Sequence, residues 1–311
     1  MPAAHCARSA EKVDLRRLRH LYPFTSRYFN RRGMCYHYLD EGRGSPVVML
    51  HGNPSWSFYY RRLVGALSPH RRCIVPDHFG CGLSETPPPQ RYGYRLKDRV
   101  DDLDALLSHL GMVAPVDLVV HDWGGMIGAV WALRRPERVN RLVIMNTAAF
   151  LPPGGKPVPW QLRWIRGSRF LAPTAVLGGN LFARGAAHMA SHKGLPAGVR
   201  KGLTAPYNNW HNRLATLKFV QDIPITPNDP SYRLVAETDA ALHRLSHCPM
   251  LICWGKHDFV FDTDYLAEWQ RRFPHARAHL FEDAGHYVLE DAPDRVAAAI
   301  CDFLNPSNHD Q

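Results

Sequence analysis

The stretch 117–133 constrains the fold most strongly, because it joins a buried strand to a helix through a very short turn. The apolar residues 118–120 that follow Asp117 predict a strand at 117–120, and 126–133 has helical character. Asp122 stands at the apex of the turn, and Gly124 and Gly125 let strand and helix approach closely. The pattern predicts a nucleophile elbow with a carboxylate at its apex, and with it a covalent ester or anhydride intermediate. Taken alone, an aspartate that caps the helix N-terminus would explain the turn equally well.

Strands alternate with helices on both sides of this turn. The alternation predicts the α/β class, with a mostly parallel, doubly wound sheet that helices cover on both faces. A chain of 311 residues is long enough for such a domain with an insertion. The expected strands lie at 28–39, 47–50, 73–76, 117–120, 141–146, 250–254 and 276–281, and the clearest helices lie at 96–110 and 291–304.

The strand pattern stops between residues 150 and 248. This segment is rich in Pro, Arg and Trp and has short helical stretches. A structureless loop of ~100 residues would be improbable in a compact domain, so the segment predicts an inserted helical cap. We therefore expect a core domain at 23–149 and 249–311, a cap at 150–248, and an N-terminal extension at 1–22.

Composition excludes several classes of protein. The 38 Lys and Arg against 28 Asp and Glu give a net charge of +10. They are dispersed without a nucleic-acid-binding motif, so a solvated surface is the first interpretation and an acidic protein or anionic lipid surface the second. No apolar run reaches the ~20 residues of a membrane-spanning helix, and the N-terminus lacks a signal-peptide core, so we expect a cytoplasmic protein. The 18 His and 7 Cys show no metal-ligand spacing, and we expect neither a metal nor a cofactor.

Four further residues suit an elbow built around Asp122. Asn53 lies in the loop that follows the apolar strand 47–50, where its amide or backbone N–H can face an anion. The indole of Trp123 is a hydrogen-bond donor without an acceptor role. Asp258 and His286 each follow a later strand, and the carboxyl ends of parallel strands meet at the crevice where such folds place their sites. A Gly-Asn-Pro turn and a packed tryptophan are the structural alternatives for the first two.

The segments HGNPSW, PDHFGCGLS, VVHDWGG, WGKHD and DAGHYVLED resemble the haloalkane dehalogenase branch of the α/β-hydrolases, over nearly all of 22–304. The resemblance implies an α/β-hydrolase fold with Asp122 as nucleophile, His286 as base and Asp258 as the acid that orients it. It also implies that Asn53 and Trp123 stabilise the departing anion. Some members carry the acid after the preceding strand, but 146–149 holds no carboxylate here, which favours Asp258.

A narrower resemblance rests on 100–104, 121–128, 146–150, 157–160 and 219–224. These stretches are similar to the OleB-type β-lactone decarboxylases of bacterial olefin biosynthesis. The resemblance implies that the chain converts cis-3,4-dialkyl β-lactones into cis-alkenes and carbon dioxide. It also implies a long-chain hydrophobic substrate and assembly with other enzymes of the olefin pathway.

Two other reactions remain open for the same residues. A haloalkane dehalogenase would form an alkyl ester on Asp122 and hydrolyse it with water activated by His286. An epoxide hydrolase, which is less favoured, would need paired cap tyrosines, for which Tyr207 and Tyr232 are the candidates. For a β-lactone, Asp122 can attack either the ring carbon that bears oxygen or the carbonyl. Large apolar side chains of the cap could line a substrate tunnel or pack the cap onto the core. They are Trp160, Leu162, Trp164, Phe170, Leu171, Leu181, Phe182, Trp210 and Phe219.

Overall fold

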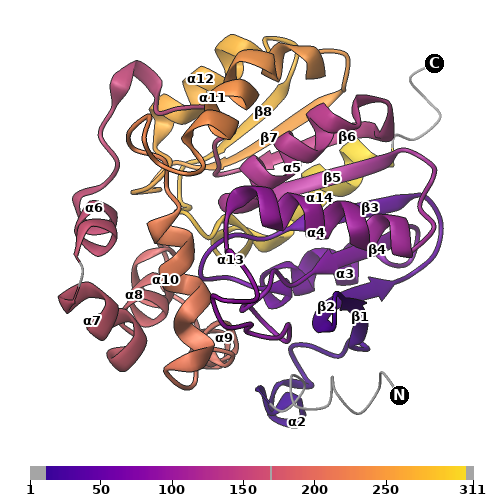
Figure 1. The fold of residues 1–311 in the computed structure, drawn as a ribbon. Helices are drawn as coiled ribbons and strands as arrows, with labels where there is room; N and C mark the ends of the chain where they lie inside the picture. The colour runs from indigo at the N-terminus through magenta and orange to yellow at the C-terminus, as the bar shows by residue number, and fades with distance from the viewer. Residues whose placement is uncertain (1–11, 169, 306–311) are drawn as a thin grey trace.

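The computed structural model describes residues 12–168 and 170–305, and contains an eight-stranded sheet (Figure 1). The strand order is β1-β2-β4-β3-β5-β6-β7-β8. The pairs β1–β2 and β2–β4 are antiparallel, and the other neighbouring pairs are parallel. This confirms the predicted mostly parallel sheet. The strands are β1 (Arg27–Arg31), β2 (Met34–Glu41), β3 (Pro46–Leu50), β4 (Arg72–Pro76), β5 (Val116–His121), β6 (Val139–Met145), β7 (Met250–Gly255) and β8 (Arg277–Phe281).

The region 28–39, expected to be strand throughout, is divided into two strands by a tight turn. Arg31 of β1 pairs with Met34 of β2 across two residues. Those two residues, Arg32 and Gly33, have φ angles of 55° and 75°. Positive φ at both positions is the conformation of the turns that join hairpin strands. The usual Asn-Gly or Asp-Gly signal is absent from the sequence, which is why the hairpin was not expected.

Helices cover both faces of the sheet. Along β3, Val48 and Leu50 belong to the buried cluster on one face, and Val47 and Met49 to the cluster on the other. A strand buried on both faces reads as a continuous apolar run because its side chains alternate between two apolar layers. Figure 1 shows α4 and α5 in front of the sheet and α14 behind it. The helices outside the 150–231 segment are α2 (Leu15–Leu18), α3 (Arg61–Leu67), α4 (Leu96–His109), α5 (Trp123–Arg134), α11 (Tyr232–Ala241), α12 (Thr263–Arg272), α13 (Val288–Asp291) and α14 (Pro293–Leu304).

In the described residues between β6 and α11, five α-helices pack mainly against one another. They form the left-hand part of the molecule in Figure 1, beyond the β5 to β7 strand ends. By contrast, α11 packs against α5 of the sheet layer. The division into a core and a cap with boundaries at residues 150 and 248 stays a prediction. The five helices are α6 (Trp160–Gly167), α7 (Leu171–Gly179), α8 (Leu181–Met189), α9 (Ala197–Thr204) and α10 (Leu214–Gln221).

The described part of the N-terminal extension packs against the rest of the chain. Val13 and Leu18 are buried in the cluster that also contains α3 and α14. The hydroxyl of Tyr22 lies 2.6 Å from that of Ser57. The first half of the extension expected at 1–22 lies outside the described residues.

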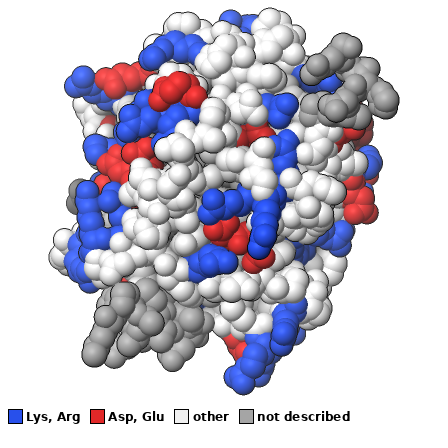
Figure 2. All heavy atoms as spheres, turned by 90° about the vertical axis from the view of Figure 1, so that its right-hand side faces the viewer, with Lys and Arg blue, Asp and Glu red and all other residues white. Residues whose placement is uncertain are grey.

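Two surface properties bear on the question of partners. Among the described helices, none combines the length and the apolar character that crossing a bilayer requires. Figure 2 shows the side of the molecule that lies to the right in Figure 1, away from α6 to α8. On that face Lys and Arg side chains are interspersed with Asp and Glu.

Candidate active site

The turn at the end of β5 has the geometry expected of an elbow. Asp122 has φ 51° and ψ −128°, and α5 begins at the next residue. Glycines make this conformation possible because the neighbouring backbone is very close. A Cβ on Gly52 would lie 1.9 Å from Oδ1 of Asp122, and one on Gly124 would lie 1.9 Å from the carbonyl oxygen of Leu50. The strained apex therefore directs the buried Asp122 side chain into the site at the carboxyl end of the sheet.

Backbone N–H groups hold the carboxylate of Asp122. The N–H of Asn53 donates to Oδ1 at 2.6 Å, and the N–H of Trp123 also donates to the carboxylate. Burial raises the pKa of Asp122, and the nearby charge of Asp258 raises it further. The two backbone donors and His286 oppose that rise. The arrangement is a buried carboxylate with one oxygen fixed by the backbone.

His286 lies between two carboxylates. Its Nδ1 is 2.7 Å from Oδ2 of Asp258, and its Nε2 is 3.6 Å from Oδ2 of Asp122. The first distance is a strong hydrogen bond, whereas the second is too long for one. Burial alone would lower the pKa of His286, but the charges of Asp258 and Asp122 outweigh it and the pKa is raised. The ring is therefore oriented by Asp258 and faces Asp122.

Asp258 is itself fixed by the strand ends around it. Its Oδ1 accepts hydrogen bonds from the N–H groups of Val260 and Phe261, at 2.7 and 3.0 Å. Its Oδ2 accepts one from the side-chain amide of Asn146 at 3.0 Å. Asn146 follows β6, and its amide also bonds both backbone groups of Gly255 at the end of β7. From the sequence, 146–149 was noted to hold no carboxylate, and no role in the site was predicted for Asn146. Its position at the end of a central strand was the available signal.

Asn53 and Trp123 lie beside the Asp122 carboxylate. The side-chain amide of Asn53 donates one N–H to the carbonyl of Thr216 on the neighbouring α10, at 3.0 Å. An amide nitrogen carries two N–H groups, so the second is available to a ligand. The ring of Trp123 packs against Phe219, with 5.4 Å between ring centroids. Both Asn53 and Trp123 line a cavity that reaches Asp122.

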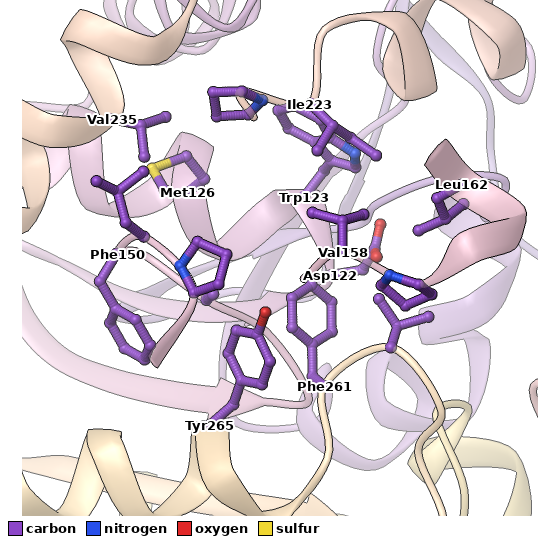
Figure 3. Close-up of a pocket in the computed structure, with 16 residues that line it drawn as sticks. Asp122, Trp123, Met126, Phe150, Val158, Leu162, Ile223, Val235, Phe261 and Tyr265 are labelled. Carbon is purple, nitrogen blue, oxygen red and sulfur yellow. The ribbon is translucent and has the colours of Figure 1, made fainter. Parts of the chain in front are cut away.

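Two largely apolar cavities meet at Asp122. The first, about 760 Å³ with its open mouth included, runs from Asp122 to Phe150 and Val235 (Figure 3). The second, about 970 Å³, runs from Asp122 and His286 between α6 and α8. The residues that line both are Asp122, Trp123, Leu162, Ile223 and Val260. We call these cavities the first arm and the second arm.

Several residues that line the first arm were not predicted as site residues. Phe261 and Tyr265 come from the segment that follows Asp258, and Met126 comes from the first turn of α5 (Figure 3). Each lies close in sequence to a predicted site residue. That proximity was the signal that could have found them.

The large apolar residues of the cap divide into three groups. Trp164 and Leu181 line the second arm as expected, as do Leu162 and Phe182. Phe219 is buried behind Trp123. The remaining four line neither arm and are not packed onto the core, because they lie exposed at the surface. They are Trp160, Phe170, Leu171 and Trp210.

The tyrosines that an epoxide hydrolase would need are not at the site. Tyr207 is buried, with its hydroxyl 3.3 Å from the carbonyl oxygen of Ser55, and it lines neither arm. Tyr232 begins α11 and also lines neither arm. Among the described residues, no group of three or more His, Cys, Asp or Glu side chains is arranged to hold a metal ion.

Comparison with known proteins places this geometry in a family. Residues 45–293 match the family model described as the α/β hydrolase fold. A cis-3-alkyl-4-alkyloxetan-2-one decarboxylase from Shewanella oneidensis is 50% identical, over 91% of this chain and 89% of the relative. One of the same name from Xanthomonas campestris pv. campestris is 46% identical, over 91% and 97%. The chain belongs to this decarboxylase family of α/β hydrolases.

The solved structures extend the same likeness. The crystal structure of a haloalkane dehalogenase from Bradyrhizobium elkani superposes with a TM-score of 0.80. It is 26% identical and covers 91% of this chain and 100% of its own. The α/β-hydrolase fold expected from the sequence is therefore confirmed. The structure brings Asp122, Asp258, His286, Asn53 and Trp123 together, and the catalytic role of each stays a prediction.

Proposed function

We propose that the protein is a β-lactone decarboxylase that converts cis-3,4-dialkyl β-lactones into cis-alkenes and carbon dioxide, with Asp122 as nucleophile. Two relatives at 50% and 46% identity carry a name for this activity. The dehalogenase structure is more distant, at 26% identity.

The two arms carry this proposal. A 3,4-dialkyl β-lactone has alkyl chains on two adjacent ring carbons, so it needs two apolar spaces that meet at the reacting centre. The first and second arms share the Asp122 end and diverge from it. A 1-haloalkane has a single chain and needs only one such space. The shape of the cavity therefore favours the lactone over the halide.

In the proposed first step a carboxylate oxygen of Asp122 attacks the ring carbon C4, which bears the ring oxygen. The C4–O bond breaks and its electron pair leaves as a carboxylate attached to C3. The second amide N–H of Asn53 and the indole N–H of Trp123 are placed to stabilise this new anion. Donors of that kind contribute roughly 3–4 kcal/mol each to a transition state in comparable sites.

In the second step the C3–carboxylate bond breaks and carbon dioxide leaves. Its electron pair forms the C3=C4 double bond and expels the Asp122 carboxylate from the opposite side. Inversion at C4 followed by anti elimination carries a cis lactone to a cis alkene. The two steps consume no water, proton or electron, so His286 acts by holding the charge of Asp122 and not as a base towards water.

Attack at the lactone carbonyl is the competing route. It would give a mixed anhydride with Asp122 and a free alkoxide at C4. Hydroxylamine distinguishes the two, because it cleaves an anhydride to a hydroxamate and leaves an alkyl ester intact. A hydroxamate from protein quenched during turnover would overturn the ring-carbon route.

A haloalkane dehalogenase is the second candidate, because Asp122, His286 and Asp258 have the arrangement that reaction needs. The two are separated by supplying the purified protein with a cis-dialkyl β-lactone and, separately, a 1-bromoalkane. Alkene is measured by gas chromatography and bromide by a halide assay, with Asp122→Asn as control. Asp122-dependent alkene formation with slow bromide release supports the proposal. Brisk bromide release with untouched lactone makes the protein a dehalogenase.

We further propose that 150–248 acts as a cap over a core of 23–149 and 249–311. The proposal extends to a cytoplasmic location and to assembly with other enzymes of olefin biosynthesis. The assembly is proposed because a long-chain lactone, which an upstream reaction supplies, is best passed directly from the enzyme that makes it. Co-purification of pathway enzymes with the tagged protein from its own cells tests the assembly.

A further inference from the structure

The net positive charge of the chain arises in one segment, because that segment has basic residues and no acidic ones. Residues 150–221 contain ten Lys and Arg residues and no Asp or Glu. The other 28 of the 38 Lys and Arg are equal in number to the 28 Asp and Glu, all of which lie outside this segment. The whole net charge of +10 is therefore carried by the region that contains α6 to α10. The ten are Lys156, Arg163, Arg166, Arg169, Arg184, Lys193, Arg200, Lys201, Arg213 and Lys218.

The same region exposes large apolar side chains. Trp160, Phe170 and Leu171 are 72%, 80% and 73% exposed. On α6 the exposed positions Trp160 and Trp164 are four residues apart and share one face of the helix. Leu162 of the same helix faces inward and lines both arms. The inward side of α6 lines the arms, and its outward side therefore forms a second, exposed apolar face.

Unpaired cations stand among these apolar residues. Arg163 lies between Trp160 and Trp164 on the exposed face of α6, and Arg184 is exposed on α8. In the described part of the chain, neither is within ion-pair distance of a carboxylate. Lys156 and Arg166 of the same region are different, because acidic residues from beyond 221 neutralise them. We call Trp160, Arg163, Trp164, Phe170, Leu171, Leu181 and Arg184 the outer cap face.

The second arm opens within this face. Trp164 and Leu181 are about half exposed, yet both also line the second arm. Met189 at the end of α8 does the same. A long alkyl chain entering between these residues would pass from the surface to Asp122 along a continuous apolar lining.

We propose that the outer cap face docks onto an anionic lipid bilayer, from which the second arm takes up its substrate. Exposed Trp, Phe and Leu beside Arg are the residues with which peripheral proteins bind a membrane interface. In Figure 1, α6 and α7 form the left-hand edge of the molecule, which leaves them free to meet a flat surface. A second copy of this chain is disfavoured as the occupant, because it would bring two acid-free surfaces together. The docking rests on the surface alone; only the uptake of a lactone rests on the proposed function.

Vesicle sedimentation of the full chain tests the docking. The vesicles are phosphatidylcholine alone or phosphatidylcholine with 30% phosphatidylglycerol, at low and high salt. We expect binding to the anionic vesicles at low salt, weaker binding at high salt because the charges are screened, and little binding to phosphatidylcholine. Absence of binding to the anionic vesicles would overturn the proposal, as would equal binding to both kinds.

Paired variants locate the docking face. Arg163→Glu with Arg184→Glu should weaken binding to anionic vesicles by at least ~20-fold. The matched control is Arg244→Glu with Arg277→Glu, two exposed arginines outside the region, which should keep most of the binding. An equal loss in this control pair would mean that binding follows net charge and would overturn the assignment of the face.

A second pair of substitutions tests what the apolar side chains contribute to vesicle binding. Trp160→Ser with Phe170→Ser should lower binding at high salt most, where charge contributes least. Val113→Ser removes an 88% exposed side chain elsewhere and should change nothing. If vesicles do not bind but the Trp160 and Phe170 variant changes the oligomeric state, the face is a protein interface and the proposal is wrong.

Activity separates this inference from the proposed function. None of Trp160, Arg163, Phe170 and Arg184 lines an arm, so the variants should turn over a short-chain, water-soluble lactone normally. Vesicle binding without lactone turnover in any form would leave the docking standing and remove the proposed reaction. Lactone turnover without vesicle binding would support the proposed reaction and overturn the docking.

Discussion

The strand ends of the sheet and the helices above them make different contributions to one active site. At the strand ends the carboxylates are held in place: Asp258 by Asn146 from the neighbouring strand end and by two backbone N–H groups of its own loop, and Asp122 by the N–H of Asn53 from the loop after β3. The helices from α6 to α10 contribute mostly apolar walls and no acidic residue. The difference indicates that the strand ends determine the chemistry, while the helices determine which molecule reaches it and from where.

The largest effect expected on the strand-end side is loss of the nucleophile. Asp122→Asn should lower alkene formation by a factor on the order of 10⁴ or more, because no covalent intermediate can form. Single-turnover gas chromatography measures it. The control Asp117→Asn changes a buried carboxylate at the other end of β5, where it pairs with Arg71, and should keep the activity. Comparable activity in the Asp122 variant would remove the proposed mechanism.

Filling one arm tests whether the helices and their loops sort the two alkyl chains. Val158→Trp narrows the first arm, and Gly185→Trp narrows the second, where a Cβ at Gly185 meets nothing within 4 Å. Each should raise KM roughly 10-fold or more for lactones with a long chain on one particular ring carbon. Two lactones with the long chain at C3 or at C4 reveal the pattern. Equal losses for both lactones in both variants would contradict the assignment of one chain to each arm.

The role of His286 sharpens the distinction between the two candidate reactions. In the lactone reaction His286 need not activate water, so His286→Ala should reduce alkene formation by less than ~100-fold. In a dehalogenase the same change would block hydrolysis of the ester, and an alkyl-enzyme would accumulate. Mass spectrometry of the quenched protein detects that adduct. Complete loss of alkene formation with intact folding and substrate binding would rule out the ring-carbon route.

The acid side of the pH profile should follow Asp122. Its pKa is raised, chiefly by burial, so alkene formation should fall with decreasing pH sooner than an ordinary aspartate would predict. Deprotonation of His286, whose pKa is also raised, should cause no comparable rise in rate. The rate at saturating lactone against pH measures this. A rate that increases as His286 loses its proton would indicate a base and favour the hydrolytic reaction.

The smallest effect concerns stability. A carboxyl group whose pKa is higher in the folded than in the unfolded chain binds its proton more tightly when folded. Ionised Asp122 therefore costs stability at pH above its folded pKa, and that cost disappears below the unfolded pKa. Asp122→Asn should raise the Tm by a few degrees at pH 7 and by less at pH 4, as calorimetry would show. An unchanged Tm at pH 7 would mean that the backbone donors fully offset the burial.

Local sequence patterns were sufficient for much of the site. The strand, the apex aspartate and the glycines at 117–133 are adjacent in the chain, and a sharp turn there requires glycine wherever backbone passes within 2 Å of a Cβ position. The parallel order of the strands then predicts that Asp122, Asp258 and His286 meet, because they all follow strands at one edge of the sheet. Likewise, the fold class followed from continuous apolar runs such as that of β3.

Contacts between distant segments decided the rest. No local pattern could show that the amide of Asn146 bonds Asp258, that the exposed Trp160 and the buried Phe219 would differ, or that two arms would diverge from one carboxylate. Each depends on how segments more than 50 residues apart pack, and an apolar side chain fits a core, a tunnel or a surface equally well until that packing is known. The sequence by itself determined the reacting groups, because a sheet aligns its strand ends by a general rule. The tertiary structure alone decided the shape around them, because shape is the sum of many contacts that no general rule supplies.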